Sequence, residues 1–196
     1  MFNASKLLIS VGLSALAATA VAQTAANIVQ RDINQETRIR SGLQDGTLTT
    51  REAALLEKRE GAADLMQANA LKDGKLTAQE RARITRAENR NSQAIHAART
   101  NGVNGNPLSA SSQRMQQGVQ RDINQQQRIE NGIHAGQLTN REVSALERGQ
   151  ARTDAKEFRA GRDGHVGAAE AQAVNNAQNR QSARIHNKRH NAANRS

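Results

Sequence analysis

The sequence predicts an all-α protein made of two tandem repeats of a three-helix unit. A segment beginning at Gln30 returns at Gln120, and the match continues to residues 99 and 189 at a constant offset of 90 residues. Good helix formers such as Ala, Gln, Glu, Arg and Leu are abundant, and the chain has a single proline. No segment alternates with the period of two that is typical of a strand.

The first 22 residues have the pattern of a secretory signal peptide. Lys6 precedes an apolar stretch from Leu7 to Val21, and the small residues Ala20 and Ala22 mark a cleavage point. The stretch is shorter than the roughly 18 to 20 residues of a membrane-spanning helix. We therefore expect a periplasmic or secreted protein of a Gram-negative-type envelope, with no membrane span after cleavage.

The first unit, residues 23–99, is expected to form three helices, because apolar residues recur in it with helical spacing. Short turns between such helices favour an up-down-up bundle. Residues 118–190 form the second unit in the same way. The expected stripes of the first unit are Ile28, Ile33, Ile39 and Leu43, then Leu56, Ala63, Met66 and Ala70, then Ile84, Ala87, Ala94, Ile95 and Ala98.

The segment between the units, residues 100–117, is expected to be a flexible linker. It contains the only proline, Pro107, several Gly and Asn residues and little apolar content. Residues 191–196 are expected to form a disordered tail. Because large apolar residues are scarce throughout the chain, we expect marginal stability and possible assistance from homodimer formation.

The turns of the first unit resemble the second half of an EF-hand calcium loop. In LKDGKLTAQE, Gly74 falls at loop position 6, Leu76 at position 8 and Glu80 at position 12, while Leu71 stands where position 3 requires a ligand. The resemblance implies weak calcium binding through helix-connecting loops. Its candidate ligands are Asn69, Asp73, Lys75 and Glu80 in loop 69–80, and Ser41, Asp45 and Glu52 in loop 41–52.

The same letters also predict helix caps that need no metal. A glycine in the left-handed conformation ends one helix, and a Thr followed three residues later by Glu begins the next. Three turns carry the complete pattern, with Thr49 and Glu52, Thr77 and Glu80, and Thr139 and Glu142. We favour this interpretation of the turns over calcium binding.

The segments LTTRE, LTAQE and LTNRE, which begin at Leu48, Leu76 and Leu138, resemble the L-T-x-x-Q motif of the Spy-like family of periplasmic helical chaperones. Glu stands here where that motif has Gln, and the tandem duplication departs from the family's pattern. The resemblance implies a dimeric helical cradle that shields unfolded proteins.

Two further groups of side chains are candidates for binding. His186 and His190 lie four residues apart on one helical face, a spacing that suits a transition metal, although histidines near a helix end also interact with the exposed carbonyls. The basic residues on the expected third and sixth helices could bind anionic partners. These residues are Arg83, Arg86, Arg90, Arg180, Arg184, Lys188 and Arg189.

The chain has no cysteine and a formal net charge of +10, which favours anionic partners and argues against thiol chemistry. No nucleophile, phosphate-binding loop or base-reading motif is recognisable, so we expect neither an enzyme nor specific nucleic-acid recognition. Asp32 and Asp122, in the two RDINQ segments, are candidates for buried polar groups or contact residues. The expected function is a stress-protective binding protein that is chaperone-like or binds anionic envelope components or partner proteins. The alternative is a periplasmic metal-binding protein, and no cofactor is expected beyond possible calcium or a transition metal.

Overall fold

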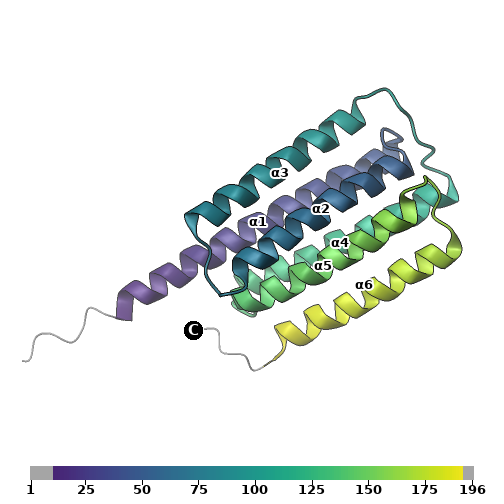
Figure 1. Cartoon of the computed structure of the whole chain (residues 1–196). Coiled ribbons are helices and arrows are strands. Elements are labelled where there is room, and N and C mark those ends of the chain that lie inside the picture. Colours follow the sequence, from purple (N-terminus) through teal and green to yellow (C-terminus); the bar gives the residue numbers. More distant parts are fainter. Residues whose placement is uncertain (1–10, 192–196) are drawn as a thin grey trace, which may run out of the picture.

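The computed structural model describes the backbone of residues 11–191 and the side chains of residues 24–191. The described part is all-α, as predicted, and contains six helices and no strand (Figure 1). The helices are α1 (Val11–Asp45), α2 (Thr50–Leu71), α3 (Ala78–Arg99), α4 (Ala110–His134), α5 (Asn140–Gly161) and α6 (Ala168–Arg189). The expected signal peptide, residues 1–22, lies outside the residues whose side chains are described. Of the expected tail, residues 192–196 lie outside the described residues.

Capping boxes begin three of the helices, and this prediction is confirmed. The hydroxyl oxygens of Thr49, Thr77 and Thr139 accept a hydrogen bond from the backbone N–H three residues on, and the Glu at that position accepts from the backbone of the Thr. At the fourth turn the N–H of Gly167 donates to Glu170, but glycine has no side chain to complete the box. The cap pattern therefore explains where α2, α3 and α5 start.

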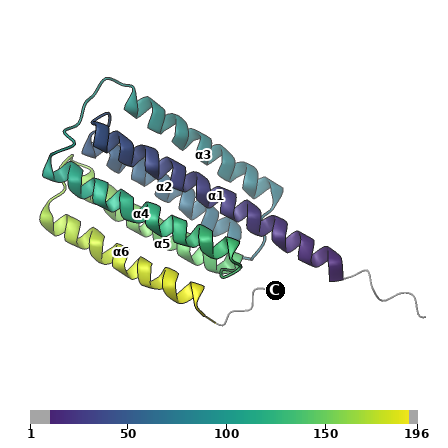
Figure 2. The same cartoon turned by 180° about the vertical axis from the view of Figure 1, so that it is seen from behind.

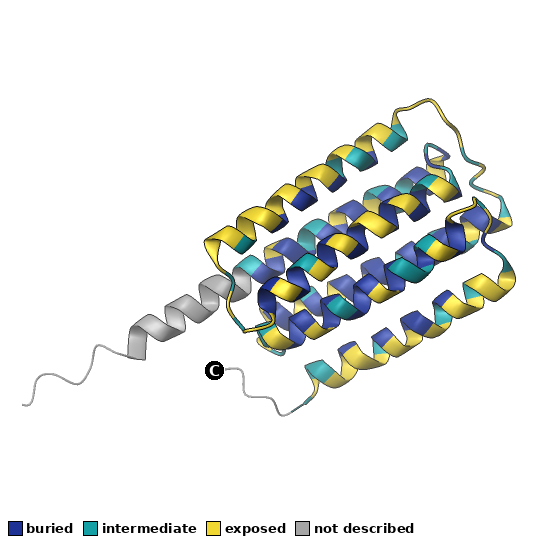
Figure 3. Ribbon diagram, in the orientation of Figure 1, coloured by how far each residue is buried: buried dark blue, intermediate teal, exposed yellow. Residues whose placement is uncertain are grey.

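Four helices form the inner part of the bundle, and two lie at its edges. Both views place α1, α2, α4 and α5 between α3 and α6 (Figures 1 and 2). Buried residues concentrate on the four inner helices, whereas α3 and α6 expose most of their surface (Figure 3). Large aliphatic residues from all six helices fill the apolar part of the core together with the small Ala25, Ala26, Ala53 and Ala54.

The most extensive contacts join helices from different halves of the chain, α1 with α4 and α2 with α5. Both pairs are antiparallel. Near the start of α4, the amide of Gln116 donates to the carbonyl of Leu43 at the end of α1, at 3.3 Å. Near the start of α5, the hydroxyl of Ser144 donates to the carbonyl of Ala68 at the end of α2, at 2.6 Å. The two halves of the chain thus pack against each other through these helix pairs.

The segment expected to be a linker is also more structured than its composition suggested. Helix α4 begins at Ala110, so residues 110–117 are helical. The N–H of Gly105 donates to the carbonyl of Gly46 at 2.9 Å, and Asn101 donates to Glu52 at 2.6 Å. These contacts tie the segment to the first turn of the protein.

The predicted apolar stripes face the interior. Ten of the thirteen predicted residues are buried, and Met66, Ala94 and Ala98 are half-buried. The side chains of these three residues pack at the margins of the core. The predicted faces of α2 and α3 therefore point inward. Among the described helices, none has the length and hydropathy that crossing a membrane requires.

A candidate metal centre in the bundle core

The core of the bundle contains many carboxyl groups, which is rare because Asp and Glu are almost never fully buried without a charged partner. All of them are at most 4 % exposed. The ion pairs between described residues involve none of them. They are Asp32 and Glu36 on α1, Glu57, Glu60 and Asp64 on α2, Glu88 on α3, Asp122 on α4, and Glu147, Asp154 and Glu157 on α5.

Helical spacing places these groups on the faces where the inner helices meet. Glu57, Glu60 and Asp64 follow one another at intervals of three and four residues, so they share one face of α2. The helices approach closely there, since a Cβ added at Gly61 would lie 3.1 Å from the Cβ of Asp154 on α5. The acidic face of α2 therefore packs against the acidic face of α5 in the middle of the bundle.

The carboxyl groups gather into two clusters. Cluster A comprises Asp32, Glu60, Asp64, Glu88 and Glu147, which form two overlapping trios, Asp32 with Asp64 and Glu147, and Asp32 with Glu60 and Glu88. In each trio one oxygen per residue lies within 4.8 Å of the others. A Ca²⁺ ion bound at roughly 2.4 Å would hold opposite oxygens roughly 4.8 Å apart, so this spacing suits shared ligation.

Cluster B comprises Glu57, Asp122 and Glu157, with ligand oxygens again within 4.8 Å of one another. The neighbouring Glu36 and Asp154 add further negative charge to it. Each cluster draws residues from both halves of the chain.

Glutamine amides orient some of these carboxylates. The Nε2 of Gln67 donates to both oxygens of Asp32, at 2.9 and 3.1 Å, and to Glu88 at 3.4 Å. The Nε2 of Gln178 donates to both oxygens of Asp122, at 3.3 and 3.4 Å, and to Glu157 at 2.8 Å. Each cluster thus has one glutamine amide that serves two different carboxylates.

Many other oxygens in the core receive no hydrogen bond from the protein. Both carboxylate oxygens of Glu57 and both of Glu60 lack a donor, and so does one oxygen of each of Glu36, Glu147 and Glu157. Seven glutamine carbonyl oxygens are in the same position, and every unpartnered buried side-chain atom of the described residues is an oxygen. A buried acceptor without a donor costs about 1–3 kcal/mol, and a charged one costs more. The core therefore has an excess of acceptors that positive charge would satisfy.

Burial and mutual repulsion shift the ionisation of the core carboxyls upward. Burial raises the pKa of Glu60 to about 8, with a further contribution from the negative charge of Glu88. Burial also raises the pKa of Glu147 to about 8 and that of Asp122 to about 7. The pKa is raised well above the ordinary value, chiefly by burial, for Asp32, Glu36, Glu57, Asp64, Asp154 and Glu157.

The ligand set has the chemistry of a hard-cation site. All its ligand atoms are carboxylate oxygens, and neither cluster contains histidine. Oxygen ligands suit Ca²⁺, Mg²⁺ and Mn²⁺, whereas thiolates and imidazoles suit softer metals. A divalent cation would neutralise two carboxylates in the core and so reduce the cost of their burial.

The residues predicted from the EF-hand resemblance lie elsewhere, in the exposed turns. Asn69, Asp73 and Lys75 are exposed. The Oδ1 of Asp73 accepts the backbone N–H of Lys75 at 2.9 Å, so it stabilises the turn. Glu80 accepts from Thr77 at 2.9 and 2.7 Å, and these hydrogen bonds lower the pKa of Glu80.

The first turn uses its predicted residues in the same manner. Asp45 accepts from Thr47 at 2.9 Å and forms an ion pair with Arg99 at 2.7 Å, which brings positive charge to the loop. The hydroxyl of Ser41 donates to a carbonyl of its own helix, and Glu52 caps the start of α2. Neither turn is among the groups of three or more metal-ligand side chains in the described part of the chain.

The predicted histidine pair does come together on α6. The rings of His186 and His190 lie 4.3 Å apart, and the Nδ1 of His190 is 2.7 Å from the carbonyl oxygen of His186. Both are exposed, and the described residues place no third histidine or carboxylate with them within metal-binding distance. Helix α6 thus offers at most two ligands at this point.

The predicted basic residues fall on opposite edges of the bundle, because α3 and α6 are its two outer helices (Figure 1). Those of α3 are exposed, as are Arg180 and Arg184 of α6. Lys188 lies 3.8 Å from Glu142, and Arg189 donates to Gln137 at 2.8 Å. The two groups therefore do not form one continuous basic face.

Asp32 and Asp122 are buried, as one of the two alternatives predicted for them requires, whereas the other buried carboxyls were not predicted. The signal was present in α2 and α5, where an acid or amide occupies positions 57, 60, 64 and 67 and again 147, 150, 154 and 157. This is the spacing of an inward helical face. Comparison with family models, with curated proteins and with solved structures finds no match for this chain.

Proposed function

We propose that this protein binds hard divalent cations, such as Ca²⁺ or Mn²⁺, with the carboxylates of its bundle core. The observation that carries the proposal is the state of Glu57 and Glu60. They are 0 % and 2 % exposed, neither carboxylate accepts a hydrogen bond from the protein, and each lies in a trio of acidic side chains of suitable spacing. A bound cation supplies the positive charge that these oxygens lack.

The proposal gives the two tandem repeats a joint role. Cluster A combines Asp32 and Asp64 of the first half with Glu147 of the second, and cluster B combines Glu57 with Asp122 and Glu157. A cation in either cluster would bind side chains of both halves. We therefore expect the two tandem repeats to unfold together. The signal-like pattern of residues 1–22 supports binding in an exported compartment.

The experiment is a calorimetric titration of chelator-treated protein with Ca²⁺, Mg²⁺ and Mn²⁺. The wild-type chain is expected to bind at least one of them. The variants Glu57→Gln and Glu60→Gln keep the side-chain shape and remove one charge each, and we expect them to weaken binding by roughly 10- to 100-fold.

The matched control is the double variant Asp73→Asn/Glu80→Gln, which changes the same residue types in an exposed turn. It is expected to retain the wild-type affinity. Loss of binding in this control, with unchanged binding in the two core variants, would assign the metal to the turns and overturn the proposal. Absence of binding of all three cations to the wild-type chain would also overturn it.

A second candidate function is the binding of an anionic envelope component, and one observation favours it. A surface groove of about 600 Å³ is lined by arginine and amide side chains, without an acidic one. Its lining residues are Arg40, Gln44, Gln113, Gln116, Gln117, Gln120, Arg121 and Asn175. Binding to vesicles that contain phosphatidylglycerol should fall at high salt and in the variant Arg40→Ala if the groove holds phosphate groups.

A further inference from the structure

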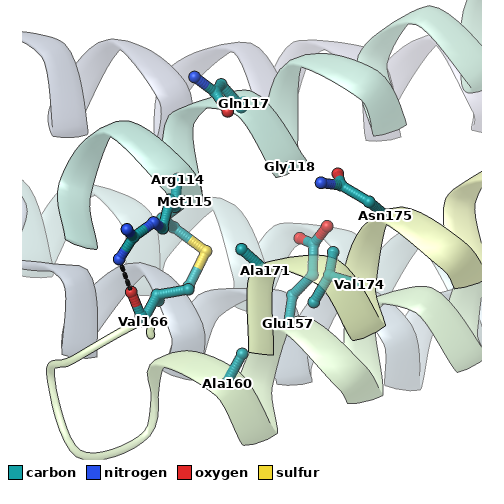
Figure 4. Close-up of a pocket in the computed structure, with 10 residues that line it drawn as sticks. All are labelled: Arg114, Met115, Gln117, Gly118, Glu157, Ala160, Val166, Ala171, Val174 and Asn175. Atoms are coloured by element: carbon teal, nitrogen blue, oxygen red, sulfur yellow. Dashed lines mark hydrogen bonds between the residues drawn. The ribbon is translucent and has the colours of Figure 1, made fainter. Parts of the chain in front are cut away.

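A small pocket leads from the surface of the second half toward cluster B. It has a volume of about 20 Å³, enough for one water molecule, and lies between α4, α5 and α6. Figure 4 shows the carboxylate of Glu157 pointing into the space between Gly118 of α4 and Asn175 of α6. Glu157 is 1 % exposed, and its Oε2 receives no hydrogen bond from the protein. The pocket thus ends at a member of cluster B.

Gly118 creates the room in which this carboxylate lies. A Cβ at this position would come within 2.8 Å of the Oε1 of Glu157. The rim beside it is held in place by Arg114, which donates to the carbonyl of Val166 at 2.7 Å (Figure 4). The opening is therefore built into the packing of α4 against the turn before α6.

The same place in the first half is filled with apolar side chains. Ninety residues before Gly118 the chain has Ile28, and the residues at the positions of Ala160 and Val174 are Ala70 and Ile84. Ile28, Ala70 and Ile84 form a small apolar cluster of their own. The residue at the position of Glu157 is the uncharged Gln67.

We infer that the pocket over Glu157 is the route by which cations enter and leave the core, and that the first half is closed at the equivalent place by Ile28. This inference rests on the proposed cation binding. Glu157 is the ligand at the pocket end of cluster B, so it meets an entering cation first. Cluster A exchanges its cation through cluster B, with which Asp64 and Asp154 provide a carboxylate connection.

Exchange kinetics test the route separately from binding. The loaded protein is mixed rapidly with a fluorescent calcium-indicator dye, and the rate of Ca²⁺ release is recorded together with the equilibrium affinity. Ala171→Leu fills the pocket from its half-buried wall on α6. We expect it to slow both loading and release by about tenfold while the dissociation constant stays near that of the wild type, as gating of access requires.

The complementary variant is Ile28→Ala, which opens the sealed place in the first half and is expected to speed release several-fold. Its control is Ile39→Ala, an equal truncation of another buried residue on α1, which is expected to leave the release rate close to that of wild type. Melting curves by circular dichroism confirm that each variant is folded.

The outcomes separate the route from the function. Wild-type release rates in Ala171→Leu, with normal affinity, would overturn the route and leave cation binding intact. Equal acceleration by Ile28→Ala and Ile39→Ala would show release by general loosening and would also overturn it. A wild-type chain that takes up no Ca²⁺ at all would refute the proposed function itself.

Discussion

Gln67 holds both carboxylate oxygens of Asp32 through one amide nitrogen, at 2.9 and 3.1 Å, deep in the bundle core. In the second half Gln178 serves Asp122 in the same way, although it comes from α6 and Gln67 comes from α2. The positions at an offset of 90 residues are exchanged, since Glu157 corresponds to Gln67 and Gln178 to Glu88. Each half therefore has one Gln and one Glu beside its own Asp, which is Asp32 in the first half and Asp122 in the second.

Replacing Gln67 with methionine tests the value of this amide. Gln67→Met keeps the side-chain volume and removes the hydrogen bonds from Gln67 to Asp32. Both buried oxygens of Asp32 then lose this donor. We expect the free energy of unfolding to fall by about 1–3 kcal/mol. Chemical denaturation measures the change, and Gln79→Met, at an exposed position, should stay within about 0.5 kcal/mol of wild type. Equal stability of the two variants would show that the amide of Gln67 does not stabilise the core.

The metal-free protein should lose stability as pH rises. The folded pKa is about 8 for Glu60 and Glu147 and about 7 for Asp122, above the values near 4 of the unfolded chain. Their stabilising contribution is complete below pH 4 and is lost as pH rises through 7 to 8. Each group costs roughly 1.4 kcal/mol per pH unit between its unfolded and its folded pKa, and the loss levels off above the folded pKa.

Melting curves between about pH 5 and pH 9 measure this effect in the presence of a chelator. The melting temperature should fall with pH, and Glu60→Gln should make the fall less steep. Saturation with a bound cation should also reduce it, because the cation stabilises the charged carboxylates. A melting temperature that is constant or rises over this range would show that the core carboxyls are not buried as described.

The close approach of α2 to α5 should make Gly61 intolerant of a side chain. A Cβ there would lie 3.1 Å from the Cβ of Asp154 and 3.3 Å from the carbonyl oxygen of Ala151, so Gly61→Ala requires α5 to shift by a few tenths of an ångström. We expect a loss of about 1 kcal/mol by chemical denaturation despite the better helix propensity of alanine, because the backbone carbonyl of Ala151 has to move. Asn69→Ala, on the exposed face of the same helix, is the control. A more stable Gly61→Ala protein would contradict this packing.

The incomplete cap of α6 offers a stabilising change. Gly167 has φ −72° and ψ 168°, which threonine adopts readily, and Glu170 already accepts its N–H. Gly167→Thr should complete the fourth capping box and raise stability by a few tenths of a kcal/mol. Thr77→Ala should do the reverse at α3, with a loss of about 1 kcal/mol. Neither change should alter cation affinity, and a parallel loss of affinity in Thr77→Ala would support the turns as metal sites.

The sequence was sufficient to predict local structure. Helical spacing of apolar residues predicted the inward faces of the first three helices, and Thr followed by Glu predicted three helix starts. These features depend on neighbours within one or two turns of the chain. The pairing of α1 with α4 and of α2 with α5 depends on contacts between distant segments, which the repeat alone does not determine.

The core carboxyls escaped prediction for a physical reason. Glu57 and Glu60 are good helix formers in a strongly charged sequence, and Asp and Glu are ordinarily solvated. Only the packing of α5 over α2 converts this acidic face into an interior one. The EF-hand-like spacing of Asp73 and Glu80 instead predicts a metal loop, whereas these residues serve a turn and a helix cap.

The most direct test of the central claim is the position of bound Mn²⁺ in crystals of the protein, located by its anomalous scattering. We expect a peak inside the bundle within coordination distance of Asp32, Glu60 and Glu88, or of Glu57, Asp122 and Glu157. Peaks confined to the turn at Asp73 and Glu80 or to the pair His186 and His190, or no peak at a saturating Mn²⁺ concentration, would contradict it.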